Sequence, residues 1–296
     1  MDHATLTRAL EDCLAALTTR DGGRFGPARY TENGQDLAVG EGLWATADRI
    51  GPYRHIVADP QAGQAACFAT VTEGRTRSIM ALRLALAADG AATEIEALVA
   101  RPSLRGGTDA FGDGPAQLDR APGPDPAWLA PIPPGERAPR EELRRVADMY
   151  FTGLEDNDGR GDYPFADDCV RIENGFRATA VPVEAGAEGE TPYAVAFRAL
   201  GAREQFESGF FRFVSRIRGR RFPVIDVERG VVFSFALFDH FGTLRDYELA
   251  DGTPITGALD RPFTWLVAEA FRIERGLFTR IEALMLPVPF GMKTGW

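Results

Sequence analysis

The residues best suited to chemistry are Asp239 and His240, which directly follow the unbroken apolar run from Val231 to Phe238. A titratable pair at the end of a hydrophobic strand suits acid–base catalysis. A histidine there can serve as general base or acid, a contribution of ~10²–10⁴ in rate. Because neighbours on a strand face opposite sides of the sheet, we do not expect Asp239 to orient His240. The alternative for His240 is a hydrogen-bonded histidine at a strand end.

Other candidates for acid–base chemistry lie on predicted strands and on one predicted helix. Glu269 stands on the same strand face as Trp265 and Phe271, where a carboxylate either has a raised pKa, as a catalytic acid would, or reaches a partner or the surface. Tyr150 lies on the apolar stripe of its helix and either donates to a developing oxyanion or fills the core. Glu173 or Glu269 would orient the His240 ring. The predicted catalytic residues are His240, Glu269, Tyr150 and Glu173.

Further polar and aromatic side chains are candidates for holding a substrate. Arg177 would help Tyr150 to stabilise negative charge. Lys293 belongs to the tail 289–296, which either folds over a pocket or simply docks. Glu173 and Asn174 repeat Glu32 and Asn33, and residues kept in both halves of a chain favour a turn or helix-cap role. The predicted substrate-binding residues are Arg177, Asn174, Asp239, Trp265, Phe210 and Lys293.

An internal repeat organises the elements that position these residues. The stretch 221–240 has the pattern of a hairpin, two apolar runs joined by the turn 227–230. Sliding the sequence by 167 positions superimposes 54–69 on this stretch, with Arg54, Asp59 and Gly63 matching Arg221, Asp226 and Gly230. The segments 32–34 and 95–98 likewise recur at 173–175 and 281–284. The sequence therefore predicts one fold written twice.

The two copies are expected to be joined by a tether. Residues 102–139 are rich in Pro, Gly and Asp, which favours an interdomain linker without a helix or strand ladder of its own. We predict a first domain at 1–101, a scaffold in function, and a second at 140–296 that holds the site. Relative to the first copy, the second has roughly 26 extra residues between 175 and 208 and roughly 19 between 240 and 264, typical of binding loops or lids.

Helical spacing of apolar residues predicts helices at 5–19, from Leu43 to Ile50, at 143–154 and from Phe206 to Ile217. Four strands follow in each copy, and the segment 24–33 is interpreted as helical or a turn. The basic tract from Arg216 to Arg221 is then expected to be a solvated helix end and turn. By the repeat, Arg83 is the counterpart of Glu269, so this acid belongs to the second copy alone.

Composition narrows the class of protein. The chain has 296 residues and a formal net charge of −10, which disfavours nucleic acid as a partner. Three cysteines in mostly apolar contexts predict buried thiols and a cytoplasmic protein, and no apolar run is long enough for a membrane span. Phosphate loops, nucleophile elbows and metal-ligand motifs are missing, so we expect neither cofactor nor metal.

The order of helices followed by an antiparallel sheet resembles the nuclear-transport-factor-2-like superfamily, in particular its SnoaL-like lyase and isomerase branch. The resemblance is carried by 163–170 (YPFADDCV), similar to that family's segment after the first helix, and by 201–206 (GAREQF), similar to the opening of its second helix. It implies an α+β fold of two tandem cone-shaped domains, each with N-terminal helices packed on a curved antiparallel sheet. It also implies an apolar pocket between the helices and the concave face of the sheet.

We therefore favour an enzyme, a cofactor-independent lyase or isomerase that uses acid–base chemistry on an apolar aromatic or cyclic small molecule. Loss of water or formaldehyde from a lignin-derived aromatic dimer and conversion of a polyketide-like or steroid-like substrate are the reactions that the resemblance implies. The alternative is a non-catalytic small-molecule-binding or assembly protein built as an intramolecular pseudo-dimer. Neither nucleic acid nor a membrane is expected as a partner, and a homodimer is left open.

Overall fold

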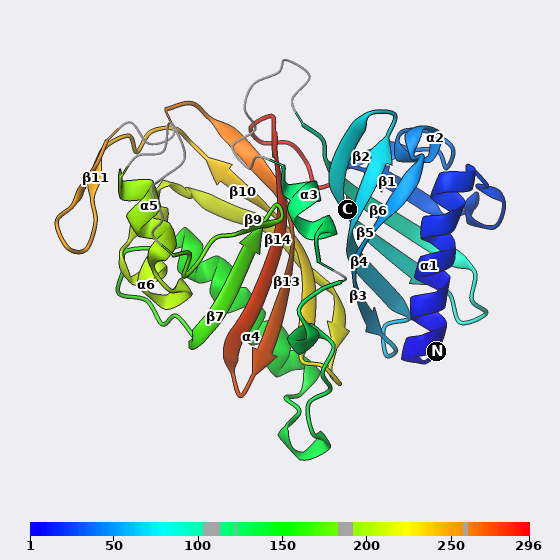
Figure 1. The fold of residues 1–296 in the computed structure, drawn as a ribbon, viewed down its shortest axis with the longest axis horizontal. Coiled ribbons are helices and arrows are strands. Elements are labelled where there is room, and N and C mark those ends of the chain that lie inside the picture. Colours follow the sequence, from blue (N-terminus) through cyan, green and yellow to red (C-terminus); the bar gives the residue numbers. More distant parts are fainter. Residues whose placement is uncertain (103–112, 122, 183–191, 257–259) are drawn as a thin grey trace.

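The protein is an α+β structure with two six-stranded mixed sheets that pack face to face (Figure 1). The structure is a computed structural model and describes residues 1–102, 113–121, 123–182, 192–256 and 260–296. We call the sheet of β1 to β6 with helix α1 the first repeat, and the sheet of β7 to β10, β13 and β14 with helix α4 the second repeat.

In the first repeat and the connecting segment, the elements are α1 (His3–Thr19), η1 (Gly23–Phe25), β1 (Arg29–Glu32), β2 (Gln35–Leu37), α2 (Leu43–Thr46), β3 (Arg49–Asp59), β4 (Gln64–Glu73), β5 (Thr76–Leu86), β6 (Ala92–Ala100), α3 (Gly114–Asp119), η2 (Pro126–Trp128) and η3 (Pro134–Glu136). In the second repeat they are α4 (Arg140–Glu155), β7 (Phe165–Glu173), β8 (Phe176–Arg177), α5 (Pro192–Ala199), α6 (Ala202–Glu207), η4 (Phe210–Phe213), β9 (Arg216–Asp226), β10 (Val231–His240), β11 (Tyr247–Glu248), β12 (Pro254–Ile255), β13 (Phe263–Glu274) and β14 (Leu277–Val288).

The two sheets have the same topology. Their strand orders are β2-β1-β6-β5-β4-β3 and β8-β7-β14-β13-β10-β9. In each sheet the first strand of the repeat runs parallel to the last, β1 beside β6 and β7 beside β14, and the other neighbours are antiparallel. The repeat detected in the sequence thus corresponds to a repeated sheet. Its first hairpin, β1 with β2, was missed, because 24–33 was interpreted as helical or a turn.

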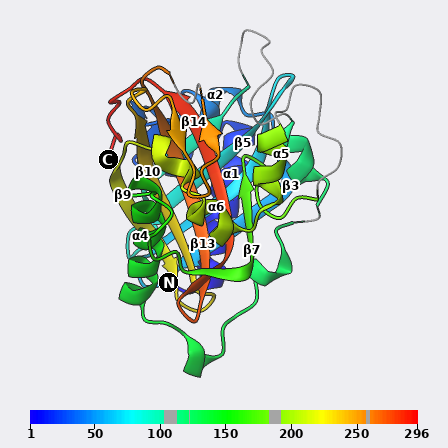
Figure 2. The same ribbon diagram turned by 90° about the vertical axis from the view of Figure 1, so that its left-hand side faces the viewer.

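Each sheet has two buried faces, so its strands carry apolar residues on both sides. We call the side covered by the repeat's own helices the inner face, and the side packed against the other sheet the interface face. The inner face of the first repeat packs on α1, and that of the second packs on α4 and α6. A third core joins the two interface faces, with Phe68 against Phe233 at 4.8 Å between ring centroids. The result is four layers, helix, sheet, sheet and helix, with the helices of the second repeat facing the viewer in Figure 2.

The Glu-Asn-Gly segments form the same turn in both repeats. Asn33 and Asn174 have φ of 49° and 45°, and each is followed by a glycine of positive φ. The side-chain amide of Asn174 donates to the Met285 carbonyl at 2.9 Å, and its oxygen accepts from the Met285 amide at 2.8 Å. Asn33 makes the same pair of bonds with Val99. Each asparagine therefore extends the ladder of the neighbouring strand, a structural role as a turn.

The basic tract was interpreted wrongly. Arg216 to Arg221 lies in strand β9, not at a helix end, and α6 ends at Glu207. The apolar residues from Phe206 to Ile217 have helical spacing only because a short α-helix, a 3₁₀ turn and the start of a strand follow one another there. Ile50 likewise belongs to β3, since α2 ends at Thr46.

The connecting segment is more ordered than its composition suggests. Of 102–139, residues 103–112 and 122 lie outside the described residues. The rest includes the short helix α3, capped by Asp113, which the prediction of a helix-free tether did not foresee. Asp119 accepts a 2.6 Å hydrogen bond from Thr70, and Trp128 is buried against His55 at 4.4 Å between ring centroids. The segment also bonds to the second repeat, where Arg280 donates to Asp125 at 2.9 Å, so it is docked on both repeats.

All three cysteines are buried and free, as predicted. Among the described residues, no helix is both long and apolar enough to cross a membrane. The β11–β12 hairpin lies in the segment that lengthens the second repeat after His240, and it projects from the molecule at the left of Figure 1.

Candidate functional site

A row of inner-face residues crosses the sheet of the second repeat and contains two carboxylates. Ser234 of β10 is opposite Glu269 of β13, Glu269 is opposite Ala283 of β14, and Ala283 is opposite Glu173 of β7. Residues directly opposite each other in a ladder point to the same face. Glu269 and Glu173 thus lie on the face that packs against α4, with strand β14 between their two strands.

Tyr150 and Arg171 complete a cluster with these two carboxylates. Tyr150, on α4, is buried and forms a hydrogen bond with Glu269. Arg171 precedes Glu173 by two residues on β7, so both face inward, and its Nε lies 3.0 Å from Glu173 Oε1. Arg171 is only 2% exposed. We call Tyr150, Arg171, Glu173 and Glu269 the acid–base cluster.

Burial controls the protonation of this cluster. Glu269 is 2% exposed, and desolvation, strengthened by the charge of Glu173, raises its pKa to about 8, although Tyr150 and Arg171 act in the opposite direction. Burial and the nearby Glu269 also raise the pKa of Tyr150 well above its usual value. Glu269 is therefore protonated at neutral pH and can donate a proton, as a general acid requires.

Aromatic rings surround the cluster. The Tyr150 ring lies 5.0 Å from Phe271, 5.3 Å from Phe206 and 5.8 Å from Phe278, measured between centroids. The Arg171 guanidinium lies 5.2 Å from the centroid of the Phe211 ring, a cation–π distance. These rings explain the desolvation of Glu269.

The structure places His240 at the far end of the same inner face. His240 is opposite Phe263, and Glu269 is opposite Ser234, six residues away along β10. At about 3.3 Å per residue, the separation along the strand is about 20 Å. The expectation that Glu269 or Glu173 orients His240 is therefore wrong.

His240 is held by aromatic stacking. Its ring lies parallel to Phe263, at 4.4 Å and 3°, and near-parallel to Phe213, at 5.7 Å and 22°. It is 1% exposed, and neither ring nitrogen has a hydrogen-bond partner among the described residues. Burial lowers the pKa of His240 to about 4, so the ring is neutral near pH 7.

Asp239 faces the other side of the sheet, as its alternation with His240 predicted. It is fully buried and accepts hydrogen bonds from Arg216 at 2.9 Å, Arg218 at 2.8 Å and Thr264 at 2.7 Å. Burial acts to raise the pKa of Asp239, but these bonds outweigh burial, so the pKa is lowered. A role in binding substrate is excluded for this carboxylate because its oxygens are taken by the protein itself.

The remaining predicted binding residues are scattered. Arg177 is exposed on β8 and donates to the Thr179 carbonyl at 2.8 Å, and Lys293 is part of the tail. Arg177 is opposite Ile172 and so faces away from Arg171 and Glu173, which makes its predicted role wrong. The role of Lys293 stays a prediction, and the side chain of Asn174 is occupied by its turn. Trp265 and Phe210 line the His240 end of the inner face. Trp265 lies 6.4 Å from His240, and Phe210 lies 5.3 Å from Phe213, between ring centroids.

The tail docks on residues of both repeats, and Arg218 of β9 donates to the Met292 carbonyl at 2.7 Å. Arg29, Arg83 and Arg221 place guanidiniums 4.1, 4.7 and 5.7 Å from the Trp296 ring centroid. The indole Nε1 of Trp296 donates to Thr31 at 2.9 Å. The tail is therefore docked, which is the second of the two alternatives that the sequence left open. Figure 1 places the C-terminal end of the chain beside β2 and β6.

The first repeat has a different set of residues in the equivalent positions. By the shift of 167 residues, Ser234 of β10 corresponds to Cys67 of β4. Ser234 is opposite Glu269 and Cys67 is opposite Leu82, so the counterpart of Glu269 is Leu82 and not Arg83. The predicted match was one residue out, and Arg83 points to the interface face beside Glu96, at 3.0 Å. The buried stripes of α1 and α4 likewise align Cys13 with Tyr150.

Glu32, the counterpart of Glu173, is saturated by the protein. It accepts hydrogen bonds from the Tyr30 hydroxyl at 2.9 Å, the Leu43 amide at 2.6 Å and Arg101 at 2.6 Å. Tyr30 in turn is the counterpart of Arg171, two residues before the glutamate. The first repeat therefore has no acid–base pair at these positions.

Sequence reasoning missed Arg171. An arginine on a short strand ordinarily indicates a solvated face, and its alternation with Cys169 and Phe165 was the available signal that it points inward. The first repeat has Tyr30 where the second has Arg171, and this difference was a second signal that Arg171 has a particular role.

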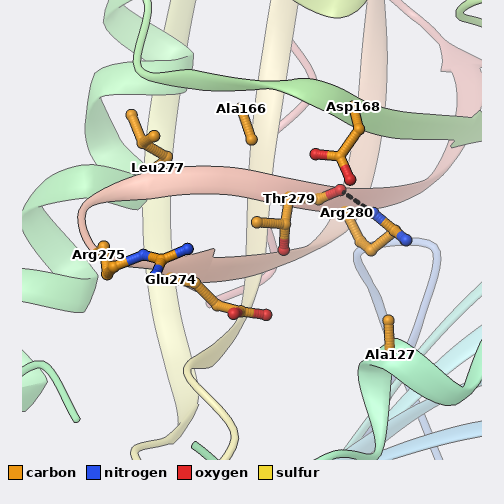
Figure 3. A pocket seen from close by; sticks show the side chains of 8 residues that line it. All are labelled: Ala127, Ala166, Asp168, Glu274, Arg275, Leu277, Thr279 and Arg280. Atoms are coloured by element: carbon orange, nitrogen blue, oxygen red, sulfur yellow. Dashed lines mark hydrogen bonds between the residues drawn. The ribbon is translucent and has the colours of Figure 1, made fainter. Parts of the chain in front are cut away.

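Two shallow hollows lined by described residues lie elsewhere. One, of ≈ 240 Å³, lies at the tip of the β13–β14 hairpin beside β7 and the connecting segment. Figure 3 shows Asp168, Glu274, Arg275 and Arg280 around it, with Arg280 donating to the Thr279 carbonyl. A neighbouring hollow of ≈ 310 Å³ shares Ala127, Glu274 and Arg275. Neither contains a residue of the acid–base cluster. No three His, Cys, Asp or Glu residues of the described ranges gather as metal ligands.

Comparison with protein families identifies one match. A domain of unknown function, DUF8021, matches residues 136–285, about half of the chain. The chain belongs to the DUF8021 family. The matched range begins in η3, ends in β14 and includes every member of the acid–base cluster.

The other comparisons add little. No curated protein matches the chain. Among solved structures, the chain is similar to a de novo designed protein with a curved β-sheet, at 14% identity and a TM-score of 0.26, over 50% of this chain and 88% of that one. A TM-score of that size does not establish a shared fold.

Proposed function

We propose that the second repeat is a cofactor-independent lyase or isomerase that acts by acid–base chemistry on an apolar aromatic or cyclic small molecule. The observation that carries the proposal is Glu269, a buried carboxyl among aromatic rings whose pKa is raised to about 8. Enzymes that work at neutral pH commonly use a carboxyl tuned in this way as their acid. The resemblance to the SnoaL-like branch points to the same class of reaction.

The roles follow from the protonation states. Glu269 donates a proton to an oxygen of the substrate. Glu173, ion-paired to Arg171, accepts a proton released from carbon or from a hydroxyl group. Tyr150 hydrogen-bonds Glu269 and sets its direction. His240 is a wall of the aromatic end, because its stacked, neutral ring is about 20 Å along the strand from the acid.

We also propose the cone shape that the resemblance implies. It is supported by the register shifts where β9 pairs with β10, since such irregularities bend a sheet. It is further supported by α4 and α6, which pack against the inner face of the second sheet and would close one side of a cone. A crystal structure of residues 1–296 tests the shape, and a flat second sheet would contradict it.

The activity is tested with compounds that report proton transfer directly. Aryl ketones, cyclic enones and 1,2-diarylpropane-1,3-diols are incubated with the protein in D₂O, and NMR follows deuterium uptake and loss of water or formaldehyde. Glu269→Gln should lower the rate by about a hundredfold or more, and Tyr150→Phe by about tenfold. Glu141→Gln, an exposed carboxylate on the same helix as Tyr150, is the control and should keep the full rate. Absence of exchange and elimination across the whole panel would refute the proposal.

The second candidate is a non-catalytic binding or assembly protein, and the interface between the sheets favours it. The two interface faces bury a common apolar core, and Asp59 and Asp226, equivalent by the repeat, each bond to the other repeat. Asp59 accepts from the Ile225 amide at 2.8 Å, and Asp226 pairs with His3 at 3.1 Å. Such an intramolecular pseudo-dimer would bind the same compounds without turning them over, and Glu269→Gln would then leave their affinity unchanged.

A further inference from the structure

Buried polar atoms without hydrogen-bond partners gather on the inner face of the second repeat. Arg171 has Nε and Nη1 in this state, Gln205 has Oε1 and Glu269 has Oε2. Arg171 Nε lies at ion-pair distance from Glu173, but the angle is unsuitable for a hydrogen bond. Buried polar groups are nearly always bonded, so an accumulation of exceptions in one place needs a physical explanation.

Backbone contacts place Gln205 beside Arg171. The Ala178 amide donates to the Arg171 carbonyl at 2.8 Å, and the Gln205 Nε2 donates to the Ala178 carbonyl at 2.7 Å. Nε2 also donates to the Phe197 carbonyl at 2.9 Å. With the nitrogen held by two carbonyls, the amide of Gln205 is fixed and its oxygen points away from both. Gln205 itself is fully buried.

These atoms form a set with both polarities. The guanidinium of Arg171 offers donors in a fixed planar fork, whereas Gln205 Oε1 only accepts. Glu269 lies next to Arg171, whose charge acts on its pKa, and its Oε2 is the fourth atom of the set. In the first repeat the positions of Arg171 and Glu269 are held by Tyr30, whose hydroxyl is bonded to Glu32 at 2.9 Å, and by Leu82, so the open set is a property of the second repeat.

We propose that this set binds a hydroxy-carbonyl head group, a carbonyl oxygen next to a hydroxyl, on an aromatic body. The carbonyl oxygen accepts from Arg171, and the hydroxyl donates to Gln205 Oε1. The aromatic body packs on the rings of Phe211 and Phe206, whose centroids are 5.0 Å apart. This inference names the substrate class of the acid–base cluster and so rests on the proposed function.

Four probes with the same two-ring skeleton separate the contributions. Benzoin carries a carbonyl and a hydroxyl, deoxybenzoin only the carbonyl, hydrobenzoin only hydroxyls and bibenzyl neither. Isothermal calorimetry on the full chain should give benzoin an affinity about tenfold above deoxybenzoin and hydrobenzoin, because a site built for a hydrogen bond rejects the analogue that lacks it. Four affinities within about threefold of one another would overturn the inference, since they would indicate apolar contact alone.

Variants assign each preference to its residue. Arg171→Lys keeps the charge without the planar fork and should shrink the preference for benzoin over hydrobenzoin to about threefold or less. Gln205→Met should abolish the preference for benzoin over deoxybenzoin. Arg177→Met, an exposed arginine on β8, is the matched control and should retain both preferences. A ranking that survives both Arg171→Lys and Gln205→Met places the head group elsewhere and overturns the inference.

The two proposals fail in different ways. The full ranking without any proton exchange would remove the proposed function and leave the head-group site standing. Exchange that depends on Glu269, combined with a flat ranking of the probes, would remove the head-group site and leave the proposed function standing.

Discussion

Glu96 and Glu282 occupy the same position in the two repeats, and each reaches across to the sheet of the other repeat. Glu96 of β6 accepts from Arg221 of β9, with one of the two hydrogen bonds at 3.2 Å. Glu282 of β14 accepts from the Tyr53 hydroxyl at 2.9 Å and lies 2.6 Å from His55 Nδ1, both on β3. The interface between the repeats therefore has the reciprocal pairing of a two-fold symmetric dimer, formed within one chain.

Replacing Glu282 should weaken the contact between the repeats. Glu282→Leu leaves the Tyr53 hydroxyl and the His55 ring buried without their partner, because all three side chains are at most 4% exposed. We expect the free energy of unfolding to fall by about 3 kcal/mol, as for other buried pairs that lose one partner. Urea unfolding followed by fluorescence measures it, with Trp128 on His55 as a local reporter. The control is Glu141→Gln, which breaks the exposed pair of Glu141 and Arg144 and should lower the free energy of unfolding by less than about 0.5 kcal/mol. A loss as small as this for Glu282→Leu would contradict the pairing.

Glu269→Gln should change how stability depends on pH. The pKa of Glu269 is about 8 in the folded protein against an ordinary 4.5, so the folded state holds an extra proton between these values. The contribution of Glu269 to the free energy of unfolding should therefore fall as pH rises from about 4.5 to 8, by roughly 1.4 kcal/mol for each pH unit in that interval, whereas His240 acts in the opposite direction below 6.5. Relative to the wild type, Glu269→Gln should therefore gain stability as pH rises through this interval and exceed the wild type above the folded-state pKa. Urea titrations from mildly acidic to mildly alkaline pH test this.

Glu173→Gln supplies the control for that titration. It removes the charge that raises the pKa of Glu269, so the fall should become smaller while remaining measurable, because burial is the larger cause. Identical profiles for wild type and Glu269→Gln would show that Glu269 is ionised in the folded protein.

His240→Phe should protect the protein against mild acid. The pKa of His240 is lowered from 6.5 to about 4, so between these values the unfolded chain binds a proton that the folded state does not. The contribution of His240 to the stability of the wild type should therefore decline as pH falls from 6.5 to 4, by up to roughly 3 kcal/mol. A phenyl ring fits the stack with Phe263 and Phe213 and does not titrate. Chemical unfolding at about pH 7 and about pH 4.5 should show that His240→Phe gains stability relative to the wild type at the lower pH, and an identical response to pH in the two proteins would refute a buried neutral ring.

Asn174→Ala and Asn174→Gly should separate the two properties of the turn. Alanine loses both hydrogen bonds to Met285 and is strained at a φ of 45°, which together should cost about 2–4 kcal/mol. Glycine loses the hydrogen bonds but accepts the positive φ, so it should cost about 1 kcal/mol less. The same pair of changes at Asn33 is the matched comparison in the first repeat. Thermal unfolding of the four variants measures both differences, and equal losses for Ala and Gly would exclude strain as a cause.

Local pattern was sufficient for much of the fold. Alternation of apolar residues located β3 to β6, and the helical stripe of Leu143 to Leu154 located α4. The pattern failed at Phe206 to Ile217, where three short elements share apolar residues at helical spacing, and at Arg216 to Arg221, where a charged tract was mistaken for a solvated end. Charge in β9 is tolerated because acidic partners come from elsewhere in the chain, Asp239 from β10 and Glu96 from the first repeat.

By itself, the sequence determined the doubling, the two Asn-Gly turns, the buried cysteines and the opposite orientations of Asp239 and His240, because each depends on spacing along the chain. Only the tertiary structure decided that His240 and Glu269 lie about six residues apart along a ladder, that Arg171 is buried beside Glu173 and that the tail docks on both repeats. These relationships join segments that are far apart in sequence. Strand register determines which of their side chains meet, and desolvation determines which are charged, and no local pattern encodes either.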